Sequence, residues 1–152
     1  MNISLICTGK TTESYVSGGM MLYLERLKHY CKFSYIELEA GKGDAVQLKK
    51  KEGENILKKT GSQDVLILLD EKGKEMTSVG FSEMIQRHQN IATKNLVFVI
   101  GGAYGFSDEV YKRANGKIAL SQMTFPHQLV RVIFLEQLYR GFTILKREKY
   151  HH

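Results

Sequence analysis

Three segments that each follow an apolar run carry the residues best suited to bind a ligand. They are Leu69–Lys74 (Leu-Asp-Glu-Lys-Gly-Lys), Ile100–Gly105 (Ile-Gly-Gly-Ala-Tyr-Gly) and Leu120–His127 (Leu-Ser-Gln-Met-Thr-Phe-Pro-His). Glycine directly after a strand lets a ligand approach the backbone closely. A tight turn explains the Gly-Gly pair equally well, and both interpretations stay open at this point.

The common nucleotide-binding and catalytic motifs are absent. No Gly-x-x-x-x-Gly-Lys-Ser/Thr phosphate loop occurs, and the glycines do not form Gly-x-Gly-x-x-Gly after the first strand. These absences count against a Rossmann cofactor domain and against Rossmann-like methyltransferases. No Ser/His/Asp arrangement stands out either. His127 is a candidate base, although a histidine in the first turn of a helix more often packs or caps.

The cysteines and histidines do not have the spacing of a metal site. There are two cysteines and five histidines, without Cys-x-x-Cys or His-Glu-x-x-His. Cys7 and Cys31 lie on apolar stretches, which favours buried free thiols. We therefore expect no metal.

The charge balance favours an anionic partner. The 22 lysines and arginines exceed the 16 acidic residues by 22 − 16 = 6. Lys49–Lys51 and Lys58–Lys59 are interpreted mainly as a solvated helix face. The tail Lys146–His152 mixes cations with a tyrosine and two histidines, and such a mixture suits phosphate contact and base stacking.

These segments must be positioned by a sheet, because short apolar runs alternate with amphipathic ones. Strands are expected at 3–7, 33–38, 65–69, 96–100 and 117–120, with Lys72–Lys74 as a turn. Helices are expected around 16–27, 44–59 and 78–88, after an N-cap at Ser107, and from Pro126 onward. Continuously apolar central strands are typical of a parallel sheet covered on both faces.

The sequence therefore predicts an α/β fold in a single domain, residues 1–152, with a parallel sheet flanked by helices. Ligands bind such sheets beyond the carboxyl ends of the strands. The N-terminus lacks the pattern of a signal peptide, and the apolar runs are too short to span a membrane. We expect a cytoplasmic protein with no membrane partner.

Several ordered motifs resemble one known family. They are Val99–Gly105, Leu120–Arg131, Glu136–Arg140 and the terminal Tyr150–His152, supported by Lys51–Glu54 and Leu69–Lys74. Over nearly its whole length the chain is similar to the RlmH family, small SPOUT-class methyltransferases that act on bacterial 23S ribosomal RNA.

The resemblance implies a SPOUT-type α/β knot, a C-terminal trefoil knot in which the end of the chain threads through a loop, and a homodimer. It implies S-adenosylmethionine as the methyl donor, bound in the knot, and methylation of N3 of a pseudouridine in 23S rRNA within the assembled ribosome. Carried over residue by residue, the cofactor contacts are Leu69, Gly101, Leu120, Ser121, Gln122, Met123, Thr124 and Phe125.

The catalytic residues are less well defined by the resemblance. His127, Arg131, Tyr150 and His151 are the candidates, and no base is assigned. Arg131 suits a dimer or RNA contact as well as a surface salt bridge. Glu136 and Arg140 stand four residues apart, which favours an ordinary helix ion pair.

Two further expectations concern assembly and substrate. The tail, with Tyr150 and His151, is predicted to reach the partner's pocket and hold the target base. Because 152 residues leave no room for an appended RNA-binding domain, we expect poor activity on naked RNA. The alternatives are a SPOUT-class tRNA methyltransferase and a non-catalytic ribosome-binding module.

Overall fold

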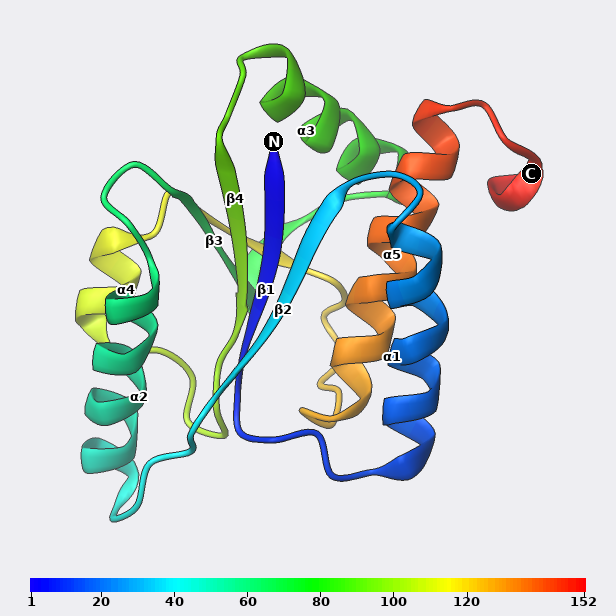
Figure 1. Cartoon of the computed structure of the whole chain (residues 1–152). Coiled ribbons are helices and arrows are strands. Elements are labelled where there is room, and N and C mark those ends of the chain that lie inside the picture. The colour runs from blue at the N-terminus through cyan, green and yellow to red at the C-terminus, as the bar shows by residue number, and fades with distance from the viewer.

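A computed structural model describes all 152 residues, and strands and helices alternate along the chain (Figure 1). The strands are β1 (Asn2–Thr8), β2 (Lys32–Leu38), β3 (Val65–Glu75), β4 (Asn95–Ile100) and β5 (Gly116–Ala119). The helices are α1 (Ser14–Leu27), α2 (Ala45–Lys59), α3 (Ser78–Asn90), α4 (Asp108–Arg113) and α5 (Leu129–Leu145), followed by the 3-10 turn η1 (Lys149–His151).

The strands form one parallel sheet in the order β2-β1-β4-β3-β5. Central strands β1 and β4 pair from Asn2 with Asn95 to Cys7 with Ile100. Because every strand runs in the same direction, all their carboxyl ends meet at one edge, the lower edge in Figure 1. The predicted parallel α/β sheet is confirmed.

Helices cover both faces of the sheet, with α1, α3 and α5 on one side and α2 and α4 on the other (Figure 1). Alternate residues of each strand point to opposite sides. In β4, Phe98 packs toward α3 and α5, whereas Val97 and Val99 pack toward α2 and α4. This accounts for the continuously apolar strands. None of the helices is both long enough and apolar enough to cross a membrane.

Three helices that pack near the sheet begin at polar caps. Asp44, Thr77 and Ser107 each accept a hydrogen bond from a backbone N–H in the first turn of α2, α3 and α4. Such a side chain satisfies a backbone donor that has no partner within the helix. The predicted start at Ser107 is confirmed, with Asp108 and Glu109 in the first turn of α4.

The predicted turn at Lys72–Lys74 is wrong, because β3 continues to Glu75 after an irregularity that follows Leu69. Its second half pairs with β5, so that Lys74 lies opposite Ile118. A Cβ atom built on Gly73 would lie 2.6–2.7 Å from backbone atoms of Ile118. Only glycine permits that approach, which brings the second half of β3 directly against β5.

The predicted start of the last helix at Pro126 is also wrong, because α5 begins at Leu129. Pro126 lies three residues earlier, and its carbonyl accepts the N–H of Val130 at 3.1 Å. The run 120–128 is therefore an irregular connection from β5 to α5 that ends in a turn at 127–128, and none of the backbone hydrogen bonds outside helices and strands involves its first part, 120–125.

Candidate functional site

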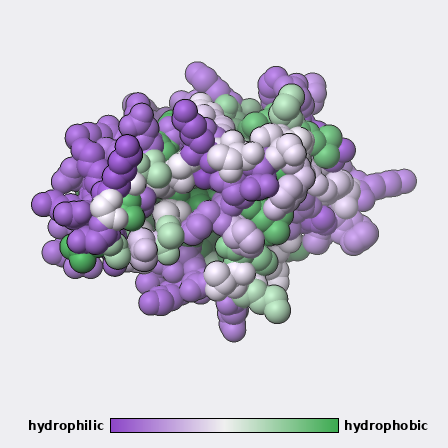
Figure 2. All heavy atoms as spheres, turned by 90° about the horizontal axis from the view of Figure 1, so that it is seen from below, coloured by the Kyte–Doolittle hydropathy of each residue, from purple (hydrophilic) through white to green (hydrophobic).

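A cavity of about 540 Å³ opens at the carboxyl ends of β4, of β5 and of the first half of β3, which pairs with β4 over residues 65–69. Figure 2 views this edge of the sheet and shows apolar residues near its centre, with hydrophilic side chains gathered on the side of α2. The volume lies within the range of about 300–1,000 Å³ that small-molecule sites occupy. All three segments that the sequence marked as ligand-binding candidates contribute to its wall.

Seven of the eight residues predicted to contact a cofactor lie on this cavity: Leu69, Gly101, Leu120, Ser121, Met123, Thr124 and Phe125. They come from three strand ends that are distant in sequence. Gln122 does not line the cavity, and its amide donates to Glu75 at 3.1 Å. The structure thus brings together all but one of the predicted set.

Glycine and exposed backbone form much of the wall. A Cβ on Gly101 would lie 3.0 Å from the ring of buried Phe106, so a larger residue there would displace the ring. Among the backbone hydrogen bonds outside helices and strands, none involves residues 120–125. Met123 N–H donates to the hydroxyl of Ser121 at 2.9 Å. Because backbone groups need partners, this run is suited to bind a polar heterocycle.

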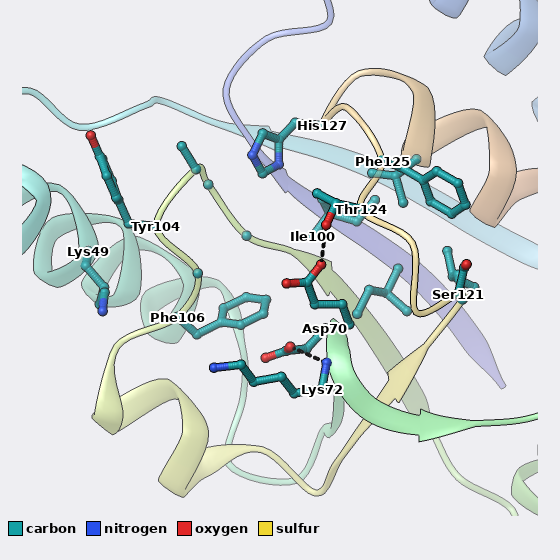
Figure 3. A pocket seen from close by; sticks show the side chains of 18 of the residues that line it. Lys49, Asp70, Lys72, Ile100, Tyr104, Phe106, Ser121, Thr124, Phe125 and His127 are labelled. Carbon is teal, nitrogen blue, oxygen red and sulfur yellow. Dashed lines mark hydrogen bonds between the residues drawn. The ribbon is translucent and has the colours of Figure 1, made fainter.

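The Gly101–Gly105 loop is both a tight turn and part of the cavity wall. Gly105 donates its N–H to the carbonyl of Gly102 at 3.2 Å and has a φ of +77°, a conformation that favours glycine. Tyr104 at the tip is 54% exposed and points away from the cavity centre (Figure 3). The tight-turn interpretation of the Gly-Gly pair is therefore confirmed, and close approach of a ligand to these glycines stays a prediction.

Acidic side chains that follow the first half of β3 form the polar side of the cavity. Glu71 accepts a hydrogen bond from Thr124 at 2.8 Å, which ties the β3 end to the 120–128 connection (Figure 3). Asp70 accepts from the hydroxyl of Tyr111 at 2.5 Å. Burial, aided by that hydrogen bond, raises the pKa of Tyr111 to about 12 and keeps the phenol neutral.

Sequence reasoning missed several residues of the wall, mainly Lys49, Phe106, Asp108, Tyr111 and Val130. Asp108 and Tyr111 lie on α4, where the only signal was proximity to the glycine pair. Lys49 comes from α2, far away in sequence, and no local pattern indicates its position. The other lysines of the two clusters, Lys50, Lys51, Lys58 and Lys59, are exposed as expected of a solvated face.

Of the four catalytic candidates, only His127 lies on the cavity. It stands in the turn before α5, and its ring faces the same space as Thr124 (Figure 3). His127 is therefore the one imidazole of this chain placed to exchange a proton with a molecule in the cavity.

Arg131 is buried and holds two segments of the chain together, so the prediction of an RNA or dimer contact is wrong. Its salt bridge, with Glu37, lies inside the chain and not at the surface, and its catalytic role stays a prediction. Its side chain is 1% exposed. The guanidinium donates to the carbonyls of Thr8 and Gly9 at 3.1 and 2.9 Å, and to the hydroxyls of Thr11 and Tyr35 at 2.8 and 3.0 Å.

One carboxylate completes this network. Glu37 lies 3.7 Å from the guanidinium of Arg131 and accepts a 2.7 Å bond from the hydroxyl of Thr11. Burial of Glu37 opposes ionisation, but hydrogen bonds from Thr11 and Tyr35 and the charge of Arg131 outweigh it and lower the pKa of Glu37. The network fastens the start of α5 to the loop after β1, which fixes where the 120–128 connection ends.

The tail lies at the opposite end of the molecule from the cavity of its own chain (Figure 1). Tyr150 donates to Glu136 at 3.1 Å, and the guanidinium of Arg140 lies 4.8 Å from the centre of its ring. Arg140 also contacts His151 Nδ1 at 3.2 Å. The predicted ion pair of Glu136 and Arg140 is confirmed at 2.7 Å.

The cysteines are free, and no metal-binding cluster is present. Cys7 is buried and Cys31 is half-buried, without a disulfide between them. Burial raises the pKa of Cys7 to about 12, so this thiol stays protonated and unreactive. No group of three or more His, Cys, Asp or Glu side chains is placed to hold a metal ion.

A parallel α/β sheet with a glycine-walled cavity at its strand ends is typical of a small cofactor-binding enzyme. The family model described as "Predicted SPOUT methyltransferase" matches residues 1–151. The chain therefore belongs to the SPOUT methyltransferase family.

Curated relatives show which methyltransferases the chain resembles. Proteins named "Ribosomal RNA large subunit methyltransferase H" are 53% identical in Christiangramia forsetii and 54% identical in Flavobacterium psychrophilum, each alignment covering 100% of this chain and 99% of the relative. The resemblance found in the motifs is confirmed, and the chain is a methyltransferase.

A solved structure supports the fold. A probable methylase family protein from Haemophilus influenzae superposes with a TM-score of 0.54 at 13% identity, over 98% of this chain and 69% of the other. The knot and the homodimer stay predictions.

Replacing Arg131 tests its role in holding two segments of the chain together. We expect Arg131→Ala to lower the free energy of unfolding by about 3–5 kcal/mol, the cost of removing one partner from a buried charged network. Arg87→Ala, an exposed arginine on α3, should change it by no more than about 0.5 kcal/mol. Urea denaturation followed by circular dichroism measures both, and equal midpoints for the two variants would contradict the assignment.

Proposed function

We propose that this chain transfers a methyl group from S-adenosylmethionine to N3 of a pseudouridine in large-subunit ribosomal RNA, within the assembled ribosome. The observation that carries the proposal is the cavity, in which glycine and free backbone from three strand ends meet at one edge of the sheet. The family match and the names of the relatives support methylation and a ribosomal RNA substrate.

The wall of the cavity has the chemistry that an adenosine with a charged amino-acid tail needs. Leu69 and Leu120 offer apolar surface, and the backbone of residues 120–125 offers donors and acceptors for the edge of a base. Asp70 and Glu71 place negative charge beside a donor that carries positive charge. When bound, S-adenosylmethionine supplies a methyl group on a sulfonium centre, which is reactive without metal assistance.

The protein's own part in the reaction is positioning and proton handling. Gly101 and Gly102 place backbone on the wall, and Phe106 and Glu52 occupy the space where their side chains would lie. Since methylation at N3 requires loss of the N3 proton, a nearby basic group or charge must assist it. His127 is the one predicted catalytic side chain on the wall and takes this position in the proposal.

We further propose that the active form is a homodimer in which the tail of one protomer completes the site of the other. Within one chain Tyr150 and His151 lie away from the cavity (Figure 1). Their aromatic rings and basic groups suit stacking on a flipped base and contact with phosphate. Two chains would then be needed to form one site.

The proposal includes the remaining expectations from the resemblance. The single domain 1–152 would form a C-terminal trefoil knot and act on ribosomes in the cytoplasm, with recognition supplied by the dimer surface and the shape of the ribosome. Transfer RNA methylation and a binding-only role are the two alternatives, and the next experiment distinguishes them.

Transfer of labelled methyl from S-adenosylmethionine tests the function. The acceptors are bacterial ribosomes that lack this methyl group, with and without the relevant pseudouridine, together with protein-free 23S RNA and bulk tRNA. We expect label in the 23S RNA of pseudouridine-containing ribosomes and little on free RNA. Label in tRNA would favour the first alternative, and no label on any acceptor would favour a binding-only protein.

A mixing experiment tests the composite site. We expect the Tyr150→Ala/His151→Ala variant to lose about 100-fold in methyl transfer, the scale of a misplaced reacting group. Gly101→Val, which fills the cavity wall, should also be inactive.

Subunit exchange between these two variants distinguishes the tail of the partner from that of the same chain. Random exchange should restore roughly a quarter of wild-type activity, because half of the dimers are mixed and each holds one intact pocket facing an intact tail. A mixture that stays inactive after verified exchange would show that the tail does not serve the partner's site.

A further inference from the structure

Glu52 on α2 is a buried carboxylate that no cation neutralises. The residue is 8% exposed, and none of the ion pairs in the chain includes it. No side chain donates a hydrogen bond to its carboxylate. An isolated buried charge is costly, so its position calls for a physical reason.

The loop that forms the cavity wall packs against this carboxylate. A Cβ built on Gly102 would lie 2.3 Å from Glu52 Oε2 and 2.9 Å from Oε1. Position 102 therefore has no side chain because the carboxylate occupies that space. Glu52 itself does not line the cavity, so it contacts the wall from behind.

Gly53, the next residue on α2, packs against the other end of the same loop. A Cβ on Gly53 would lie 2.3 Å from the hydroxyl oxygen of Ser107, the N-cap of α4. Glu52 and Gly53 thus contact the two ends of the segment from Gly102 to Ser107. The outer side of this segment is free, since Ala103 and Tyr104 are exposed.

The electrostatic environment of Glu52 agrees with a role that depends on the shape of its side chain and not on an ion pair. Burial raises the pKa of Glu52, and the backbone N–H of Gly41, in the loop before α2, works against that rise. The carboxylate therefore lies between two backbone segments, the β2–α2 loop and the loop after β4.

We propose that Glu52 is a positioning residue of the cofactor cavity, whose buried carboxylate packs behind Gly102 and holds the Gly101–Gly105 loop in the conformation that forms the wall. The proposal rests on the proposed function in one respect, the identity of the ligand. In this role the Glu52 carboxylate acts through its shape and as a hydrogen-bond acceptor. Glutamine, whose amide has the same shape, should therefore replace it.

The first test is the affinity for S-adenosylmethionine by titration calorimetry on the full chain. We expect Glu52→Ala to raise the Kd about tenfold, or about 1.4 kcal/mol, while kcat at saturating cofactor changes little. Glu52→Gln should bind within about twofold of wild type. Glu54→Ala removes an exposed glutamate of the same helix and should leave the Kd unchanged.

A double-mutant cycle tests the contact itself. Gly102→Ala alone should raise the Kd, because its methyl group meets the carboxylate. In the Glu52→Ala/Gly102→Ala variant that methyl enters vacated space, so the loss should be smaller than the product of the two single effects. Melting temperatures show whether each variant is folded, and the rise in Kd expected for Gly102→Ala alone keeps the proposal testable if Glu52→Ala does not fold.

Two results would overturn the proposal: wild-type affinity in Glu52→Ala, whether or not its melting temperature falls, or single effects that multiply without coupling. A loss in Glu52→Gln as large as in Glu52→Ala would contradict the role through shape. If the wild-type chain itself does not bind S-adenosylmethionine, the proposed cofactor is wrong, and that outcome is distinct from failure of the Glu52 contact.

Discussion

The site depends on one constraint: at one edge of the sheet, the backbone must pack directly against neighbouring groups of the protein. Three glycines make it possible: Gly73 against Ile118, Gly101 against Phe106, and Gly102 against Glu52. At each of them a Cβ would meet atoms at 3.0 Å or less. Since strand ends from distant parts of the sequence meet there, the missing side chains let neighbouring groups pack directly against the backbone and leave backbone groups on the wall of the cavity.

Buried polar contacts then fix the segments that the glycines bring together. Arg131 anchors the start of α5 to the loop after β1, and Glu71 holds Thr124 in the connection before α5. Glu52 supports the loop after β4 from the opposite face of the sheet. The wall is thus held from both helical layers, and positioning of this kind is what transfer from a reactive donor mainly requires.

Local patterns predicted the sheet well because its strands are continuously apolar and its helices have clear caps such as Asp44 and Ser107. They failed where tertiary contacts override local preference. Lys72–Lys74 has turn chemistry but pairs with β5, and Pro126 precedes α5 without starting it. Arginine is a common RNA contact, but Arg131 is buried. Lys49 and Glu52 lie close to the cavity because α2 packs there, and no pattern of residues along the sequence indicates that packing.

The central claim is that the three strand ends form the cofactor cradle, and amide chemical shifts test it most directly. Titration of the ¹⁵N-labelled chain with S-adenosylmethionine should shift the amides of Leu69, Gly101, Gly102 and residues 120–125, and leave those of the outer face of α3 unchanged. Saturable binding with shifts confined to another surface would contradict the account.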